Sequence, residues 1–268
     1  MLMNDPIRDL LDLDTYPIDR LDEDAGQALV ARCQSDLEQS GMFNLAGLLR
    51  PPAIRRAITE VMPLLRAESF THKRLHNIYF KKDIPGLPPD HPALRQVETI
   101  NHTICTDQLA GSVVREIYEW PAMGAFLAAV MGKPALYIMA DPLAGANVMQ
   151  YRAGEALNWH FDRSEFTTTL LLQASEQGGE FEYRTDLRTD ADPNYDGVAK
   201  LLAGKDPQSR ILRLAAGTLN VFRGKNTAHR VTPVVGDQDR IIAVLSYYER
   251  PGTAFSAEER IGFYGRAG

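Results

Sequence analysis

The sequence predicts a mainly β domain, an antiparallel barrel or jelly roll with flanking helices and a helical layer before it. Two observations carry this prediction. In the first half of the 268 residues, apolar side chains recur at helical spacing, whereas short β-rich runs separated by turn residues fill the second half. Because most of these runs follow one another without a helix between them, the strands are expected to pair antiparallel.

The expected organisation is one domain with three parts. Residues 1–132 form a largely helical N-terminal part, residues 133–250 form the β-barrel core, and residues 251–268 form a C-terminal tail. A composition of 44% hydrophobic and 24% charged residues is ordinary for a globular chain of this length, so one large domain can bury a sizeable core.

The helical part is predicted from its amphipathic segments. Residues 21–40 place apolar side chains at four-residue intervals, and Gly41 follows as a stop signal. Two further helices are expected near residues 108–118 and 121–131.

Another helix is expected to follow Pro51 and Pro52, because proline is favoured at the first positions of a helix. Pro63 should kink or end it, since proline lacks the backbone N–H that the helix interior uses. The expected inward face consists of Ile54, Ile58, Val61 and Met62.

The β-rich part begins near residue 134. Its runs are, in order, ALYIMA, ANVMQY, FTTTLLL, GEFEY, RILRL, GTLNVF and RIIAVLSYY. One helix is expected to interrupt them, with Asp192 as its N-cap, Pro193 at its first position and Gly204 just beyond its end. The turns between the runs contain Asp141-Pro142, Gly178-Gly179, Gly217 and Gly236-Asp237.

The charge pattern and cysteine count exclude several classes of function. The net charge of −6 is spread along the chain, so a nucleic-acid partner is not expected. No apolar run approaches the roughly 20 residues of a membrane span, and the acidic start MLMNDPIRDLLDLD resembles no targeting peptide. A cytoplasmic protein without a membrane partner is therefore expected. Cys33 and Cys105 are too few and too isolated for a disulfide framework, so both are expected to be buried thiols.

Two histidines of the β-rich part are candidate metal ligands. His160 and Asp162 lie two positions apart, so in a strand their side chains point to the same face. His229 lies 69 residues downstream, where barrel closure can bring it beside the first pair. Two imidazoles and one carboxylate on one face of an octahedron suit the Fe(II) oxygenases. An isolated His-x-Asp is more often structural, because so short a pattern is common by chance.

Arg240 adds context to this pattern. It lies 11 residues after His229 and opens the strand RIIAVLSYY, where its guanidinium can reach into the barrel and hold a carboxylate through two parallel hydrogen bonds. Taken alone, Arg240 is more often expected at the surface, as most arginines are.

Taken together, His160, Asp162, His229 and Arg240, in this order in a β-rich half, resemble the Fe(II)/2-oxoglutarate-dependent oxygenases. The resemblance implies a double-stranded β-helix fold, Fe(II) as cofactor, 2-oxoglutarate and O₂ as cosubstrates, and Arg240 as the partner of the distal carboxylate of 2-oxoglutarate. The stretches NVMQYRAGEALNWHFDRSEF, GGEFEYRTDLR, NYDGVAKLL and GTLNVFRGKNTAHRVTPV are similar to a bacterial subgroup of free amino-acid hydroxylases and halogenases.

The halogenases of that subgroup carry glycine in place of the metal-binding carboxylate, which opens a position for chloride. Because Asp162 is present here, the resemblance implies hydroxylation of an unactivated C–H of a small polar substrate, an amino acid or its derivative. The same oxidant can also give desaturation, epimerisation or cyclisation, which the motif does not distinguish. An alternative of another class is a binding or sensor barrel with a structural zinc, although such sites normally have four protein ligands.

Further residues are candidates for holding the cosubstrate. Asn147 lies on the strand before the ligand strand, and the resemblance implies that a polar residue there helps to hold 2-oxoglutarate; a simple strand-capping amide is the alternative. Some members of the family carry a serine two residues after the arginine, but here that position is Ile242. Thr169 is the hydroxyl expected to assist instead.

The substrate is expected to be a small molecule, and the oligomeric state is not predicted. Arg163 directly follows Asp162, and the run RLHNIYF places Arg74 and His76 on one face of an expected strand over the site. Either arginine can bind a carboxylate or phosphate of the substrate bidentately. For Arg163 a solvated position or a local ion pair with Glu165 is the alternative.

Overall fold

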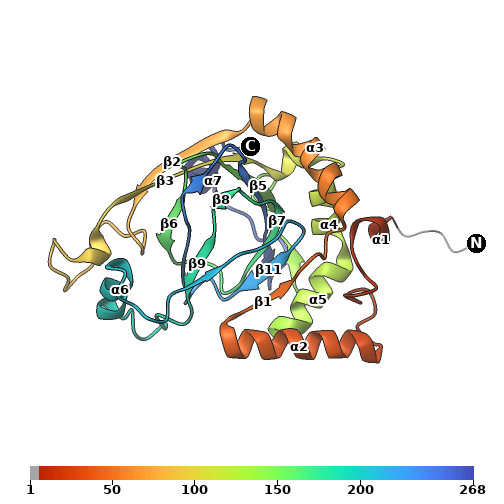
Figure 1. The fold of residues 1–268 in the computed structure, drawn as a ribbon, viewed down its shortest axis with the longest axis horizontal. Helices are drawn as coiled ribbons and strands as arrows, with labels where there is room; N and C mark the ends of the chain where they lie inside the picture. The colour runs from red at the N-terminus through yellow and green to blue at the C-terminus, as the bar shows by residue number, and fades with distance from the viewer. Residues whose placement is uncertain (1–5) are drawn as a thin grey trace, which may run out of the picture.

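Two antiparallel β-sheets form the centre of the structure, a computed structural model that describes residues 6–268 (Figure 1). This mainly β architecture with flanking helices confirms the predicted fold class. The larger sheet has the order β1-β11-β7-β14-β5-β3-β2, with the strands β1 (Met42–Leu45), β2 (Phe70–His76), β3 (Val97–Ile104), β5 (Ala146–Tyr151), β7 (Thr167–Gln173), β11 (Leu219–Phe222) and β14 (Arg240–Leu245).

The smaller sheet has the order β10-β9-β12-β6. Its strands are β6 (Leu157–His160), β9 (Phe181–Arg184), β10 (Arg210–Leu212) and β12 (Ala228–Val231). Phe181 of this sheet contacts Phe222 of the larger sheet, with 4.9 Å between ring centroids, so the two sheets meet across an interior. Two short pairs complete the β-structure: β8 (Gln177–Gly178) with β13 (Val234–Val235), and β4 (Tyr137–Ile138) with β15 (Tyr247–Tyr248).

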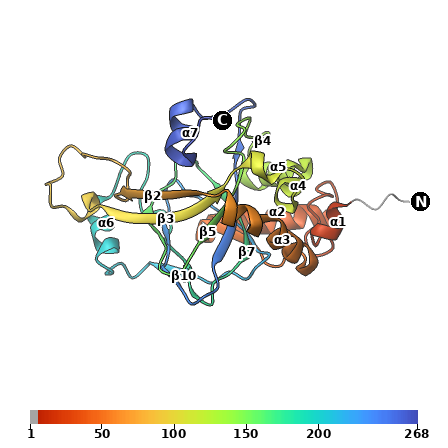
Figure 2. The ribbon, with the colours of Figure 1, turned by 90° about the horizontal axis from the view of Figure 1, so that it is seen from above.

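Helices cover the larger sheet on its outer side. In Figures 1 and 2, α1 to α5 gather on one side of the strands, α6 lies on the opposite side, and α7 lies apart from both groups. The helices are α1 (Ile7–Leu10), α2 (Asp24–Ser40), α3 (Pro51–Ala67), α4 (Val113–Glu119), α5 (Pro121–Met131), α6 (Tyr195–Leu202) and α7 (Ala257–Tyr264), with 3₁₀ turns η1 (Pro92–Leu94) and η2 (Thr106–Leu109). The strands β1, β2 and β3 come from the part of the chain expected to be largely helical, so the larger sheet uses both predicted parts.

Alternation along the strands separates a helix-facing core from the interior of the barrel. The outward side chains, among them Val148, Leu170 and Ala243, are buried in one cluster with residues of α2 to α5. Because successive side chains of a strand point to opposite faces, their neighbours Asn147, Thr169 and Ile242 face the other way, into the barrel. The face of the larger sheet that packs against the helices is thus apolar, whereas the face toward the barrel interior is mixed and partly polar.

Three local expectations for the helices differ from the structure. Helix α3 continues through Pro63 to Ala67 and buries a face one residue earlier than expected, because small side chains allow the helix to approach the sheet closely. That buried face is Ala53, Ala57, Val61 and Leu65, whereas the expected Ile54, Ile58 and Met62 are only partly buried against the same core.

The cap of α6 is Asn194 rather than Asp192, and the helix begins at Tyr195. The Asn194 side chain accepts a hydrogen bond from the backbone N–H of Gly197, whereas Asp192 caps the preceding turn by accepting from the N–H of Asn194.

Both cysteines, Cys33 and Cys105, are buried, as expected.

The helix expected near residues 108–118 is divided in two. The turn η2 ends before Gly111, whose φ of +71° breaks the helical path, and Ser112 caps a new helix, α4.

Candidate metal centre

His160 and His229 face each other across two neighbouring strands. They are direct register partners of β6 and β12, and their ring centroids lie 4.1 Å apart. Each Nδ1 lies within hydrogen-bond distance of a backbone carbonyl, 2.8 Å from Asn158 O for His160 and 3.0 Å from Thr227 O for His229. An Nδ1–H donated to these carbonyls leaves each Nε2 with a free lone pair, the arrangement of a metal-binding imidazole.

Asp162 completes a group of three. Its Oδ1 lies 3.4 Å from Nε2 of His160, and its Oδ2 lies 3.4 Å from Nε2 of His229. One ligand atom of each residue lies within 4.8 Å of the others, a spacing that small side-chain adjustments can bring onto one ion with ligand distances near 2.1 Å. The structure therefore brings together the three residues predicted as ligands.

The charges of this group are coupled. Burial raises the pKa of Asp162, but the neighbouring imidazoles of His229 and His160 outweigh it and hold this pKa well below its usual range. Burial likewise lowers the pKa of His229, yet the Asp162 carboxylate outweighs it and raises this pKa. The pKa of His160 is lowered by burial and by His229. Metal binding at the two Nε2 atoms therefore competes with protonation of the imidazoles.

Gly224 and Thr167 form the backing of the Asp162 carboxylate. The Thr167 hydroxyl donates a hydrogen bond to Oδ2, and the Asp162 N–H donates to the carbonyl of Gly224 at 3.0 Å. A Cβ on Gly224 would lie 2.2 Å from Oδ2 and 2.6 Å from the Thr167 hydroxyl, closer than any real contact. Sequence reasoning missed Gly224, whose one visible signal is its position five residues before His229.

Replacing Gly224 with alanine is expected to weaken Fe(II) binding by roughly 10- to 100-fold, as the loss of a group that orients a ligand does. The new methyl group must push the Asp162 carboxylate away from the two imidazoles. Anaerobic competition with a chromophoric chelator measures the affinity, and circular dichroism checks the fold. The matched control is Gly262→Ala in α7, where a Cβ meets no atom within 4 Å. An unchanged affinity in the Gly224 variant would show that the carboxylate is not held as described.

Arg240 is a buried cation at the other end of the interior. It opens β14 opposite Tyr151, is 3% exposed, and its Nη1 has no hydrogen-bond partner within residues 6–268. Burial lowers its pKa to about 10, and its guanidinium carbon lies 5.8 Å from the centre of the Tyr151 ring. A buried guanidinium without a counter-charge is costly, so this position suits an anionic ligand.

The Tyr151 hydroxyl is a second group beside this position that sequence reasoning missed. Among the described residues its hydrogen-bond partner is the sulfur of Met149, a weak contact at 3.8 Å, and burial raises the pKa of this hydroxyl to about 12. The hydroxyl therefore stays protonated at neutral pH and can donate to a carboxylate held by Arg240.

Asn147 and Thr169 share one cross-strand row, because both are register partners of Val244. The Asn147 amide donates to the carbonyl of Leu143 at 2.7 Å and accepts from the Tyr264 hydroxyl at 2.9 Å. The Thr169 hydroxyl donates to the carbonyl of Asn220 at 3.3 Å. Both side chains are thus engaged with the protein, and their roles toward 2-oxoglutarate stay predictions.

The structure divides the three residues predicted to bind substrate. Arg163 is exposed, pairs with Glu259 of α7 at 3.0 Å rather than with Glu165, and lies over the Phe263 ring. It is therefore directed toward the C-terminal helix.

Arg74 and His76, by contrast, lie beside the metal ligands. The His76 ring stacks on Phe80 at 4.5 Å and lies 6.5 Å from the His160 ring, while the Arg74 guanidinium lies 4.9 Å from the centre of Phe80.

Arg188 is a further cation near the centre. Its guanidinium carbon lies 3.9 Å from the centre of the Phe161 ring, and its Nε donates to the carbonyl of Lys225 at 2.8 Å. Burial lowers the pKa of Arg188, although Tyr79, Asp190 and Asp162 act against this shift. No spacing in the sequence relates Arg188 to the ligands, so the sequence could not reveal it.

Comparison with known proteins identifies the family. The model of the Halogenase D family matches residues 25–257. No curated protein matches the chain. Within residues 6–268, the longest and most apolar helices fall short of what a membrane span requires.

Solved structures share the fold at low sequence identity. AviO1 from Streptomyces viridochromogenes Tue57 is 18% identical, with a TM-score of 0.56 over 83% of this chain and 96% of that one. HygX from Streptomyces hygroscopicus, solved with nickel and 2-oxoglutarate bound, is 12% identical, with a TM-score of 0.56 over 83% and 88%. The α-ketoglutarate-dependent epimerase SnoN from nogalamycin biosynthesis is 15% identical, with a TM-score of 0.55 over 83% of each chain.

These likenesses confirm the double-stranded β-helix as the fold. Together with the family match over most of the chain, they lead to one conclusion: the chain belongs to the Halogenase D family and is built on the fold of the 2-oxoglutarate- and iron(II)-dependent oxygenases.

Proposed function

We propose that this protein is an Fe(II)- and 2-oxoglutarate-dependent dioxygenase that hydroxylates an unactivated C–H of a small polar substrate, an amino acid or its derivative. The observation that carries the proposal is the position of the Asp162 carboxylate, 3.4 Å from each of two Nε2 atoms. Two imidazoles and one carboxylate are the donor set that suits non-haem Fe(II) oxygenases. Three protein ligands leave three positions for the cosubstrates, whereas a structural zinc normally has four protein ligands.

The outcome of the reaction follows from the same carboxylate. Although the family model is named for a halogenase, Asp162 takes the third ligand position, and Thr167 and Gly224 hold it there. With that position taken by the protein, a halide has no ready place beside the metal. Hydroxylation is therefore favoured over halogenation.

The residues around the centre orient the ligands and keep water out. Arg240 and the Tyr151 hydroxyl are placed to hold the distal carboxylate of 2-oxoglutarate. The rings of Phe181 and Phe222 pack against His229, with centroids 5.6 and 4.8 Å away, and shield its imidazole from solvent. Iron with 2-oxoglutarate and O₂ supplies an oxidant strong enough to attack unactivated carbon, so the protein decides the product by positioning the substrate.

Cationic side chains support an anionic group on the substrate. The Arg74 guanidinium lies over the Phe80 ring, and Arg188 uses Nε toward a backbone carbonyl, so both can offer nitrogen atoms to a carboxylate or phosphate. His76 lies on the same side, but its ring nitrogens are engaged by the Asn77 carbonyl at 3.1 Å and the Thr99 hydroxyl at 2.7 Å, so its ring would contribute by packing. Arg163 can join them if its exposed ion pair with Glu259 opens, which costs little.

The test is turnover with product analysis. Anaerobically iron-loaded protein receives 2-oxoglutarate and then O₂, with a panel of amino acids and their N-acyl or phosphorylated derivatives, and succinate is followed by mass spectrometry. We expect one panel member to raise succinate formation and to give a product about 16 mass units heavier, from one added oxygen. A product lighter by two hydrogens would indicate desaturation or cyclisation, and one of unchanged mass would indicate epimerisation.

Two histidine variants complete this experiment. His160→Ala should abolish succinate formation, while His91→Ala, which removes a histidine that caps η1, should behave like wild type. If succinate never exceeds the iron-only control and His160→Ala matches wild type, the barrel is a binding module rather than this enzyme.

A further inference from the structure

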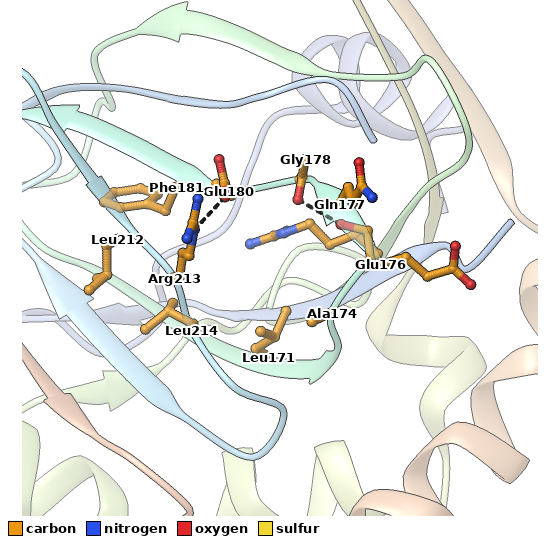
Figure 3. Close-up of a pocket in the computed structure, with 13 residues that line it drawn as sticks. Leu171, Ala174, Glu176, Gln177, Gly178, Glu180, Phe181, Leu212, Arg213 and Leu214 are labelled. Atoms are coloured by element: carbon orange, nitrogen blue, oxygen red, sulfur yellow. Dashed lines mark hydrogen bonds and ion pairs between the residues drawn. The ribbon is translucent and has the colours of Figure 1, made fainter. Parts of the chain in front are cut away.

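A cavity of about 580 Å³ lies beside Arg240 (Figure 3). Its size falls in the range of about 300 to 1,000 Å³ that drug-sized ligands fill, whereas 2-oxoglutarate has only about ten non-hydrogen atoms. The cavity therefore has more room than the cosubstrate needs.

The lining of the cavity runs from the interior to solvent. Arg240, at one end, is 3% exposed, while the side chain of Arg213, which lines the same cavity, is 83% exposed. Between them the wall combines the apolar side chains of Leu171, Phe181, Leu212 and Leu214 with polar and charged ones, among them Glu176 and Glu180. In Figure 3, Arg213 points toward Glu180 above Leu214, and Gly178 lies across the cavity from these leucines. A solvent-filled space thus connects the buried guanidinium with the surface.

Phe181 connects the lining of this space with the metal centre, although His160, Asp162 and His229 do not line it themselves. Phe181 lines the cavity, and its ring centroid also lies 5.6 Å from that of His229. Arg74 and His76 do not line this cavity, because the residues that line it come from other segments than β2 and β3. The cavity is therefore formed by other residues than those proposed to bind the substrate.

The outer rim is closed only weakly. Arg213 Nε and Glu180 Oε1 are 2.7 Å apart across it, but exposed pairs of this kind stabilise a structure by at most about 1 kcal/mol. The opposite rim is bare backbone: Gly178 and Gly179 have φ of +63° and +60°, and a Cβ on Gly179 would lie 3.0 Å from Cδ of Arg240. The same Cβ would lie 2.3 Å from Oγ of Ser175, so only glycine fits at this position of the rim.

We propose that this cavity is a passage through which 2-oxoglutarate reaches Arg240 and through which succinate leaves, separate from the residues proposed to bind the substrate. The proposal rests on the proposed function. Its physical basis is that this route from solvent ends at the buried Arg240, which is placed to hold the far carboxylate of the dicarboxylate.

The test narrows the passage and measures how fast the cosubstrate moves. Leu212→Trp places an indole in the cavity, whereas Ile211→Trp, one residue earlier in β10, places it in solvent, because Ile211 is 54% exposed and does not line the cavity. Rapid anaerobic mixing of the Fe(II)-loaded protein with 2-oxoglutarate is followed by the absorption of the iron chelate. Chasing the bound cosubstrate with excess succinate gives the dissociation rate.

A narrowed passage raises the barrier equally in both directions. For Leu212→Trp we expect association and dissociation rates that both fall by about tenfold or more, with the dissociation constant unchanged within about twofold. Ile211→Trp should match wild type in all three values. Leu214→Trp, which fills the same cavity from another residue, should repeat the result.

Two outcomes would overturn the passage. In one, both leucine variants exchange 2-oxoglutarate at the wild-type rate. In the other, the dissociation constant rises while the association rate stays unchanged, which would make the cavity part of the binding site instead. If the wild-type protein forms no chelate at all, the proposed function itself fails, so the two failures are distinguishable.

Discussion

An Asp162→Ala protein is expected to lose hydroxylation by roughly 100-fold or more. Losing a group that merely orients a metal ligand typically costs 10- to 100-fold, so losing the ligand itself should cost at least the upper end of that range. The substitution also removes the charge that raises the pKa of His229 and leaves the two imidazoles without their common partner. Product formation and succinate formation are both measured, in buffer without halide.

The control for this variant is Asp190→Ala, which removes an exposed carboxylate paired with Lys225 and should leave turnover unchanged. If the Asp162→Ala protein hydroxylates in halide-free buffer as fast as wild type, then Asp162 is not a ligand and the preference for hydroxylation loses its basis.

Replacing Arg240 with methionine should have opposite effects on binding and on stability. Removing one partner of a buried charge pair costs about 2 to 5 kcal/mol, so the dissociation constant for 2-oxoglutarate should rise by roughly 30-fold to several thousand-fold. The free energy of unfolding of the protein without cosubstrate should increase by roughly 1 to 3 kcal/mol, because a buried cation without a partner is replaced by an apolar side chain of similar length.

The pH dependence gives this prediction a second measurement. Burial lowers the pKa of Arg240 in the folded protein to about 10, below its value of 12.5 in the unfolded chain. Above pH 10 the folded protein therefore releases this proton before the unfolded chain does, and the cost of the buried charge is relieved as pH rises. The stability difference between the methionine variant and wild type should accordingly shrink above pH 10.

Calorimetric titration of the iron-loaded proteins and thermal unfolding of the metal-free proteins measure the two effects. Arg213→Met is the matched control: it removes an arginine of the same cavity that is mostly exposed, and it should change neither quantity by more than about twofold or 0.5 kcal/mol. A weaker 2-oxoglutarate affinity with an equally large loss of stability would indicate disrupted folding rather than a lost carboxylate partner.

The sequence predicted which residues form the candidate centre, but it did not predict the contacts that hold them together. The two-residue spacing placed His160 and Asp162 on one side, yet β6 ends at His160 and Asp162 lies beyond it. What holds the carboxylate is the loop with Gly224 and the Thr167 hydroxyl. These contacts join segments far apart in the chain, and single-sequence patterns carry no information about such pairings.

The helices were likewise predictable where local sequence decides their structure, and not where tertiary packing does. The amphipathic period of α3 is visible in the sequence, but the choice of a face with Ala53 and Ala57 depends on how close the sheet lies. At α6, Asp192 and Asn194 are both good cap residues, and only the completed turn decides between them. Arg188 contacts Phe161 through tertiary packing alone, so no residue spacing in the sequence could predict this contact.

The position of β14 in the larger sheet has a consequence for how the chain is made. β14 lies between β7 and β5, although the ribosome produces it after both of them. Until residues 240–245 leave the exit tunnel, β5 and β7 each keep an unpaired edge, and such edges invite pairing with other nascent chains. Slower translation at low temperature, with chaperones in excess over nascent chains, should therefore increase the yield of folded protein more than a higher expression level does.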